Sequence, residues 1–174
     1  MSYHYKSLNM VSTQYFSTLI ENILKAYFNE EEYPAQKIPG PETDELFALT
    51  GQMLSWEEYV ILSLALMPHI HPQVLDVFFI KNAVYDRPFT EFGGWEGVLH
   101  KGFLPTGETA AFLITGGKSE RRSVVSNILS KNHWFYTEKI LHLDHAMNEP
   151  FLSGKLLVTK KFLDKVFNNP VLKS

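Results

Sequence analysis

A glycine-lysine-serine sequence, Gly117 to Ser119, follows an apolar run in FLITGGKSERR and comes closest to a phosphate-binding loop. Such a loop requires G-x-x-x-x-G-K-[ST], because the first glycine lets the chain wrap until successive backbone N–H groups face the phosphates. Phe112 stands where that glycine would have to be. We therefore interpret Gly116 and Gly117 as positive-φ turn positions between two helices, with Lys118 exposed beside them.

Two pairs of histidines have spacings that a metal site could use. His69 and His71 would share one face of a strand, but the prolines around them place them at a break between helices. His142 and His145 fall at the edge of an expected hairpin. Zinc needs three or four converging ligands, and the first pair has no third one nearby. The second pair, with Asp144 between them, could supply ligands if the strand ended there, but an exposed hairpin edge is the favoured interpretation. We expect no metal site and no cofactor, and the absence of a G-x-S-x-G elbow leaves no catalytic residue to assign.

The composition is that of a folded globular protein. The chain has 174 residues, 45% of them hydrophobic, including thirteen phenylalanines, and a disordered chain lacks such apolar area. It has no cysteine, which excludes disulfides, thiolate metal ligands and a cysteine nucleophile. The N-terminus has no apolar stretch of signal-peptide length, and no run of about eighteen apolar residues occurs. We expect a cytoplasmic protein that does not contact a membrane.

Charge is distributed unevenly along the chain. The net charge is −3, but residues 1–117 carry six basic against fourteen acidic residues, whereas residues 118–174 carry ten against five. Acidic runs mostly form a solvated face and less often bind a basic partner. The basic part could contact phosphates or, equally, an acidic protein.

Periodic apolar residues predict helices over about 11–80. One amphipathic helix is expected over 11–28, followed by a surface connection in YPAQKIPGPET. Ser55 and Glu58 form a capping box that begins a second helix, predicted to stop at Pro68. Pro72 suits the first turn of a third helix, HPQVLDVFFIKN.

The segment from about 84 to 106 is expected to be a long irregular loop. It is the part of the chain richest in glycine, proline and aromatic residues. Loops of this length without structure of their own are usually functional or tightly packed. Both interpretations remain open for its aromatic and glycine residues, because aromatics anchor loops and glycines permit their turns.

The region of about 107–168 has the order helix, Gly-Gly turn, helix and two-stranded hairpin. Thr106 is the expected N-cap of the first helix, and Ser119 that of a second helix reaching about Lys131. Short apolar runs near Leu141 and Leu157 predict the two strands, and a last helix is expected over 159–167. We predict one domain over 1–174, mainly α with a small β-hairpin (α+β): winged-helix-like, with extra N-terminal helices.

A winged helix suggests a nucleic-acid-binding alternative. The helix after the Gly-Gly turn would contact DNA, and basic side chains there could neutralise phosphates. The chain is acidic overall, and no run of Asn, Gln or Arg suggests that base edges are read. The candidate residues for this alternative, a DNA-binding regulator, are Lys118, Arg121, Arg122 and Lys131.

Five segments between about Tyr15 and Phe167 carry a resemblance to a known family. They are YFSTLIENILKAYFNEEEY, TDELFALT, HPQVLDVFFIKNAVYDRPFTEFGGWEG, HKGFLPTGETAAFLITG and EPFLSGKLLVTKKFL, of which FTEFGG and GFLPTGET are the most specific parts. In them the chain resembles the N-terminal region of a family of bacterial AAA+ ATPases. Many of these ATPases come from Bacteroidetes, and some are encoded beside phage-tail-like contractile injection systems.

The resemblance implies a winged-helix-like module that selects a substrate or partner for an ATP-driven motor. The motor itself cannot be assigned in this sequence, which has no P-loop, no acidic Walker B strand and no arginine finger. We therefore expect a non-catalytic domain that binds a protein, while ATP binding belongs to the motor. The candidate partner-binding residues are Phe89, Glu91, Phe92, Gly93, Gly94, Trp95, His100, Phe103 and Gly107.

Overall fold

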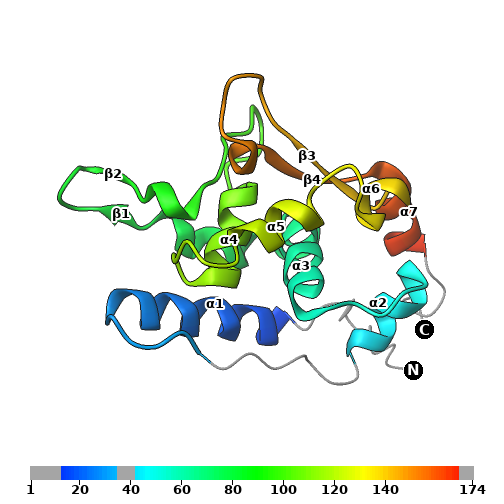
Figure 1. Ribbon diagram of the computed structural model, residues 1–174, viewed down its shortest axis with the longest axis horizontal. Helices are drawn as coiled ribbons and strands as arrows, with labels where there is room; N and C mark the ends of the chain where they lie inside the picture. The colour runs from blue at the N-terminus through cyan, green and yellow to red at the C-terminus, as the bar shows by residue number, and fades with distance from the viewer. Residues whose placement is uncertain (1–12, 35–41, 169–174) are drawn as a thin grey trace, which may run out of the picture.

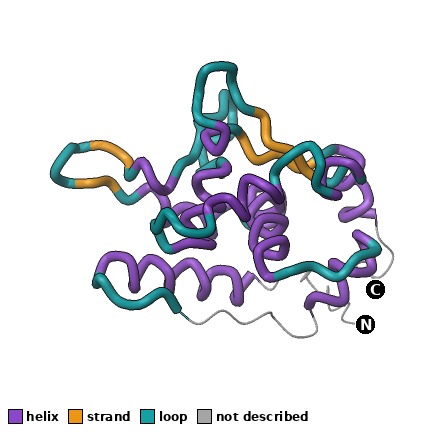
Figure 2. Tube along the Cα trace, viewed as in Figure 1, coloured by secondary structure: helices purple, strands orange, loops and turns teal. Residues whose placement is uncertain are grey.

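The computed structural model describes residues 13–34 and 42–168 (Figure 1). It combines helices with two small antiparallel sheets, so the predicted α+β class is confirmed. Figure 2 shows that helices make up the body of the molecule and that the strands lie at its edges. A single cluster of buried hydrophobic residues draws members from α1 through α7. Most of the predicted surface connection, residues 35–41, lies outside the described residues.

Helix α3 (Trp56–Ile70) is the centre of this core. The predicted capping box is present: Ser55 Oγ accepts from Glu58 N at 3.1 Å, and the Glu58 carboxylate accepts from Ser55 N at 2.8 Å. The prediction that this helix stops at Pro68 is wrong: the helix continues through Pro68 for two more residues, to Ile70. Proline removes one N–H only, and the last turn still closes through a bond from His71 N to Met67 O. Burial of Trp56 and of nine consecutive residues, Tyr59–Met67, stabilises it.

Two helices precede α3 in the chain. Helix α1 (Thr13–Phe28) runs along the bottom of Figure 1 and buries the predicted apolar face, with Phe16, Ile20 and Ile23 in the core. Helix α2 (Glu42–Thr50), which periodicity alone did not predict, buries Leu46 and Leu49.

The chain after α3 is less helical than predicted and the following loop is more ordered. Residues Pro72–Phe79 form a 3-10 helix, η1, rather than an α-helix. Strands β1 (Lys81–Asn82) and β2 (Arg87–Pro88) pair antiparallel and form the hairpin that projects at the left of Figure 1. A 3-10 turn, η2 (Thr90–Phe92), then returns the chain to the core. After η2, residues 93–106 form no helix or extended strand, although Trp95 and Leu104 pair in an isolated bridge.

Helices α4 (Gly107–Thr115) and α5 (Arg122–Ile128) flank the predicted Gly-Gly turn. Thr106 is the N-cap of α4, and Gly116, in the left-handed region at φ 65°, ends it, as predicted. Ser119 is not the N-cap of α5: that position is taken by Arg121, also at positive φ, and the helix ends at Ile128 rather than near Lys131.

The last part of the chain contains the predicted hairpin. A short helix, α6 (Trp134–Thr137), leads into β3 (Leu141–Asp144), which pairs antiparallel with β4 (Lys155–Val158) in the register Leu141↔Val158. A 3-10 turn, η3 (Phe151–Ser153), lies between the strands, and α7 (Lys160–Asn168) follows them. Among the described residues no single helix is long and apolar enough to span a membrane; α3 and η1 meet that criterion only as a pair bent by 105°.

Candidate interaction surfaces

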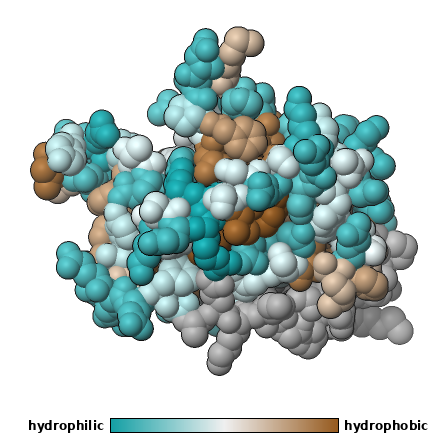
Figure 3. All heavy atoms as spheres, viewed as in Figure 1, coloured by the Kyte–Doolittle hydropathy of each residue, from teal (hydrophilic) through white to brown (hydrophobic). Residues whose placement is uncertain are grey.

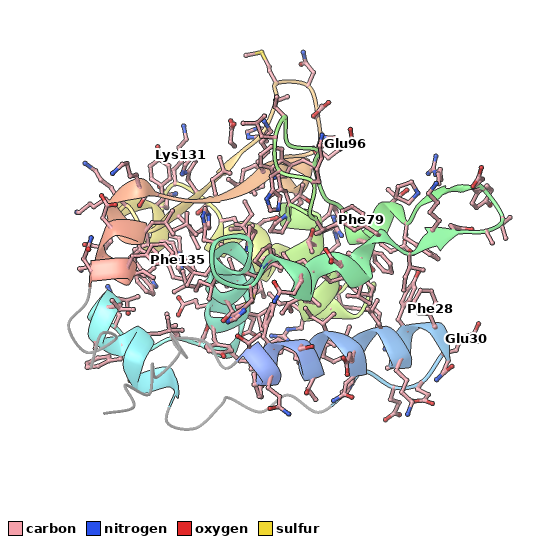
Figure 4. All side chains as sticks on the ribbon, turned by 180° about the vertical axis from the view of Figure 1, so that it is seen from behind. Phe28, Glu30, Phe79, Glu96, Lys131 and Phe135 are labelled. Atoms are coloured by element: carbon pink, nitrogen blue, oxygen red, sulfur yellow. The ribbon has the colours of Figure 1, made fainter. Side chains whose placement is uncertain are left out.

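Aromatic rings anchor the loop that carries most of the candidate residues. Phe92 is 1% exposed, and its ring centroid lies 4.8 Å from Phe112, 4.9 Å from Phe89 and 5.6 Å from Phe78. Phe28, labelled in Figure 4, rises from the end of α1 to meet Phe89 at 5.4 Å. These edge-on and tilted contacts fix the start of the loop against η1, α4 and α1. Phe92 thus belongs to the core and is not accessible to a partner.

Glu91 also holds the loop in place. Its carboxylate accepts a hydrogen bond from the Tyr27 hydroxyl of α1. Burial raises the pKa of Tyr27 to about 12, and the hydrogen bond and the negative charge of Glu91 add to the rise. The hydroxyl therefore stays protonated and keeps donating at any physiological pH.

A small hydrogen-bond network joins η2 to the start of α4. The buried Thr109 hydroxyl donates to Phe92 O at 2.7 Å and accepts from Thr106 N at 3.1 Å. The buried Thr106 hydroxyl accepts from Gly94 N at 3.1 Å. Because α4 lies inside the core, these hydrogen bonds hold the start of the loop in one position. They also require the backbone at Gly93 to pass very close to the Thr106 side chain.

Three further candidates, Gly94, Phe103 and Gly107, are packed closely against other parts of the protein. A β-carbon at Gly94 would lie 2.6 Å from the ring of Phe103, which is itself buried. A β-carbon at Gly107 would lie 2.8 Å from Leu152 O. The geometry therefore gives Phe89, Glu91, Phe92, Gly93, Gly94, Phe103 and Gly107 contacts within the protein.

The remaining two candidates, Trp95 and His100, line an apolar groove of about 540 Å³. Trp95 N donates to Leu104 O at 2.9 Å, so the segment between them folds into a narrow loop. The other walls are the end of α3 and strand β4. The lining residues, which we call the apolar groove, are Ala65, Pro68, His69, Trp95, Gly97, Val98, Leu99, His100, Leu104, Pro105, Leu156 and Leu157.

Val98 and Leu99, at the tip of this loop, are the most exposed large hydrophobic residues near the groove. Val98 is 91% exposed and Leu99 is 88% exposed. Sequence reasoning missed both, although a visible signal existed: two aliphatic residues in GVLHKG, between glycines and charges, are unusual in a loop. Two such side chains beside an apolar groove form a patch that a protein partner could cover.

Polar atoms of the groove walls lack partners. In the described part of the chain, Trp95 Nε1 and His100 Nε2 are buried without a hydrogen bond. Lys155 Nζ lies 4.4 Å from the centroid of the Trp95 ring and adds a cation at the rim. Partial burial lowers the pKa of His69, and the nearby His100 lowers it further, so His69 is neutral at physiological pH. The groove is therefore mainly apolar, with a few polar groups in its walls and one cation at its rim.

The residues proposed for the DNA-binding alternative divide into two kinds. Arg122 forms a bidentate pair with Glu108 at 2.6 and 3.0 Å, which raises the pKa of Arg122. Arg121 pairs with Glu57 at the start of α3. Lys118 and Lys131 are exposed and form no ion pair with a described residue. Both arginines are thus already neutralised by carboxylates of the same chain.

The Gly-Gly turn packs beneath two tyrosines of the N-terminal part. A β-carbon at Gly116 would lie 2.5 Å from the Tyr33 ring, and one at Gly117 would lie 3.0 Å from Tyr27. Phe112, where a phosphate-binding loop would have its first glycine, is buried in α4. These contacts confirm the interpretation of Gly116 and Gly117 as turn positions with positive φ.

No family model, curated protein or solved structure matches this chain. Among residues 13–34 and 42–168, no group of three or more His, Asp or Glu side chains is placed to hold a metal ion. The predicted helix-end position of His69 and His71 is confirmed, since His69 lies in the last turn of α3 and His71 is its C-cap.

Proposed function

We propose that this chain is a non-catalytic module that recruits a protein to a AAA+ motor, and that the apolar groove binds an apolar segment of that protein. The observation that carries the proposal is the pairing of an unfilled groove with two almost fully exposed aliphatic residues, Val98 and Leu99. Covering such side chains contributes about 1.5–3 kcal/mol each. The motor is proposed from the family resemblance of the sequence, and the cytoplasmic location from its composition, which includes no cysteine.

A winged-helix-like arrangement supports the same assignment. Thr106 forms an isolated antiparallel bridge with Lys155, and Leu156 N donates to Pro105 O at 3.1 Å. The segment before α4 therefore runs beside β4 as a third, short strand-like element. This element, followed by α4, the Gly-Gly turn, α5, α6 and the β3–β4 hairpin, supports a winged-helix-like module, a type of fold that serves protein contacts as well as DNA binding.

An extended apolar peptide is the occupant that the groove fits best. Its walls are mostly aliphatic and aromatic, which suits the apolar side chains of such a peptide. A motor that remodels proteins would gain from a module that holds exposed apolar segments, since folded proteins bury most of theirs.

The Leu99→Asp variant tests this proposal. Selection of displayed peptides on the wild-type chain should enrich apolar sequences, and Leu99→Asp should weaken the selected peptide at least about tenfold, because a charge replaces an apolar contact. Fluorescence anisotropy with a labelled selected peptide would measure this change. Val84→Asp is the matched control: Val84 is 83% exposed but lies between β1 and β2, in the hairpin that projects at the left of Figure 3. Equal losses in both variants, or enrichment of polar peptides, would contradict the proposal.

If the chain binds DNA at all, we expect Arg121 and Arg122 to contribute little to its affinity for duplex DNA. Their pairs with Glu57 and Glu108 would have to break before they contact phosphates. Duplex binding should be no tighter than non-specific binding, about 10⁻⁴–10⁻⁶ M, and the double change Arg121→Ala and Arg122→Ala should leave its salt dependence nearly unchanged. Tight duplex binding that the double variant abolishes would favour a DNA-binding regulator instead.

A further inference from the structure

A second hollow, of about 570 Å³, lies on a different part of the surface from the apolar groove. It is formed by α6, β3 and the start of α7, and shares no residue with the groove. Figure 4 labels Lys131, beside the hollow, at the upper left, and Glu96, in the loop of the groove, well apart from it and nearer the centre of the view. The lining residues, which we call the basic hollow, are Lys131, Tyr136, Thr137, Lys139, Leu141, His142 and Thr159.

The cations of the basic hollow have no acidic partners. Among the described residues, ion pairs engage Arg121, Arg122, His133 and Lys160, but neither Lys131 nor Lys139. A smaller hollow on the other side of Lys139 adds Lys161 and Lys165, and the acid that lines it is Glu138. Lysines outnumber acids here, whereas Arg121 and Arg122 are neutralised by carboxylates of the chain itself.

Lys139 occupies a backbone position that glycine or asparagine would suit better. Its φ is 55°, in the left-handed region, where a long side chain is uncommon. The turn is fixed by bonds from Lys139 N to Tyr136 O at 3.0 Å and from the Thr159 hydroxyl to Lys139 O. A residue kept in an unfavourable conformation points to a role for its side chain, and here that side chain lines both hollows.

The surface between the cations is apolar. Tyr136 is 42% exposed, and Leu141 forms the floor beside it. A ligand that complements this arrangement carries negative charges around one apolar side chain. A nucleic-acid backbone fits less well, because phosphate binding draws on many cations at once and the nearest arginines are already paired.

We propose that the basic hollow binds an acidic segment of a protein, with carboxylates at Lys131 and Lys139 and an apolar side chain against Tyr136. This interaction is independent of the apolar groove, so the module would contact its partners at two places. It goes beyond the recruitment of an apolar segment, and either interaction can fail without the other.

The test uses the chain with a fluorescein-labelled, glutamate-rich peptide that carries one phenylalanine. We expect saturable binding that weakens with salt and weakens further when the phenylalanine is replaced by glycine. Lys139→Gly should reduce affinity by up to about fivefold while leaving the melting temperature unchanged or higher, because glycine relieves the left-handed backbone. The double change Lys131→Glu and Lys139→Glu should reduce affinity by at least about tenfold.

Lys101→Glu is the matched control, because Lys101 is an equally exposed lysine in the loop of the apolar groove. The proposal predicts that it has little effect and that Leu99→Asp has none. Equal losses for Lys101→Glu and Lys131→Glu would reduce the interaction to general charge attraction and overturn the proposal. Unchanged affinity in both single variants, Lys139→Gly and Lys131→Glu, would also overturn it. So would binding of a single-stranded oligonucleotide at the same lysines that is tighter than binding of the peptide.

Discussion

Replacing Phe92 with alanine should lower the free energy of unfolding by about 3–5 kcal/mol, as expected for a fully buried phenylalanine. Its ring contacts Phe78, Phe89 and Phe112, so the substitution opens a cavity where η1, η2 and α4 meet. These elements cannot close it freely, because Thr109 and Thr106 hold the backbone directly after Phe92, at Phe92 O and Gly94 N. Urea denaturation followed by circular dichroism would measure the loss.

Phe79→Ala is the control for this prediction. Phe79 follows the buried Phe78 but is 52% exposed, and the side chain it touches is Phe103, at 5.7 Å. Its removal should cost much less, about 1 kcal/mol or below. If Phe92→Ala instead left stability intact and abolished partner binding, Phe92 would be a contact residue and the core assignment would be wrong.

Gly93→Ala should lower the free energy of unfolding by about 2–4 kcal/mol, through two effects that add. Gly93 has a φ of 63° and ψ of −139°, a conformation that is unfavourable for any residue with a β-carbon. The added β-carbon would also lie 2.2 Å from Thr106 Oγ1 and 3.0 Å from Thr109 N. The backbone would have to move and break the bond from Gly94 N to Thr106.

Gly51→Ala separates the two effects. Gly51 has a similar φ of 72°, but a β-carbon there would meet nothing within 4 Å. Its substitution should therefore cost only the backbone strain, about 1–2 kcal/mol. Equal losses of stability at Gly51 and Gly93 in thermal unfolding would show that the close contact with Thr106 is not tight in solution.

The elements that sequence reasoning predicted correctly are those fixed by local chemistry. The Ser55–Glu58 capping box, the Gly-Gly end of α4 and the apolar stripe of α1 depend on residues within a few positions of one another. The β3–β4 hairpin also follows from two short apolar runs. The α+β class could be derived from these elements.

The errors lie where tertiary contacts override local preference. Helix α3 passes Pro68 because its buried residues hold it, and η1 winds as a 3-10 helix although its periodicity suits an α-helix. Arg121, rather than Ser119, is the N-cap of α5, and its φ is positive. Its side chain pairs with Glu57, a residue 64 positions away in the sequence. No window of local sequence contains such a partner.

The candidate site was predictable as a segment but not residue by residue. The density of aromatics and glycines marked the loop correctly, yet Phe92 and Phe103 proved to be buried, whereas Val98 and Leu99 proved to be exposed. Which apolar residues of a loop face the core depends on what packs against it. The same holds for His69 at the end of α3, which reaches the groove from a distant part of the chain.

The central claim is that the apolar groove receives an apolar segment of another protein. Amide chemical-shift mapping by NMR, with a selected apolar peptide added to the chain, tests it most directly. The account predicts that the largest shifts fall in residues 95–105, at the end of α3 and at Leu156 and Leu157, while the β1–β2 hairpin stays unchanged. Shifts concentrated in the hairpin or around Lys118 and α5, with the groove unaffected, would contradict it.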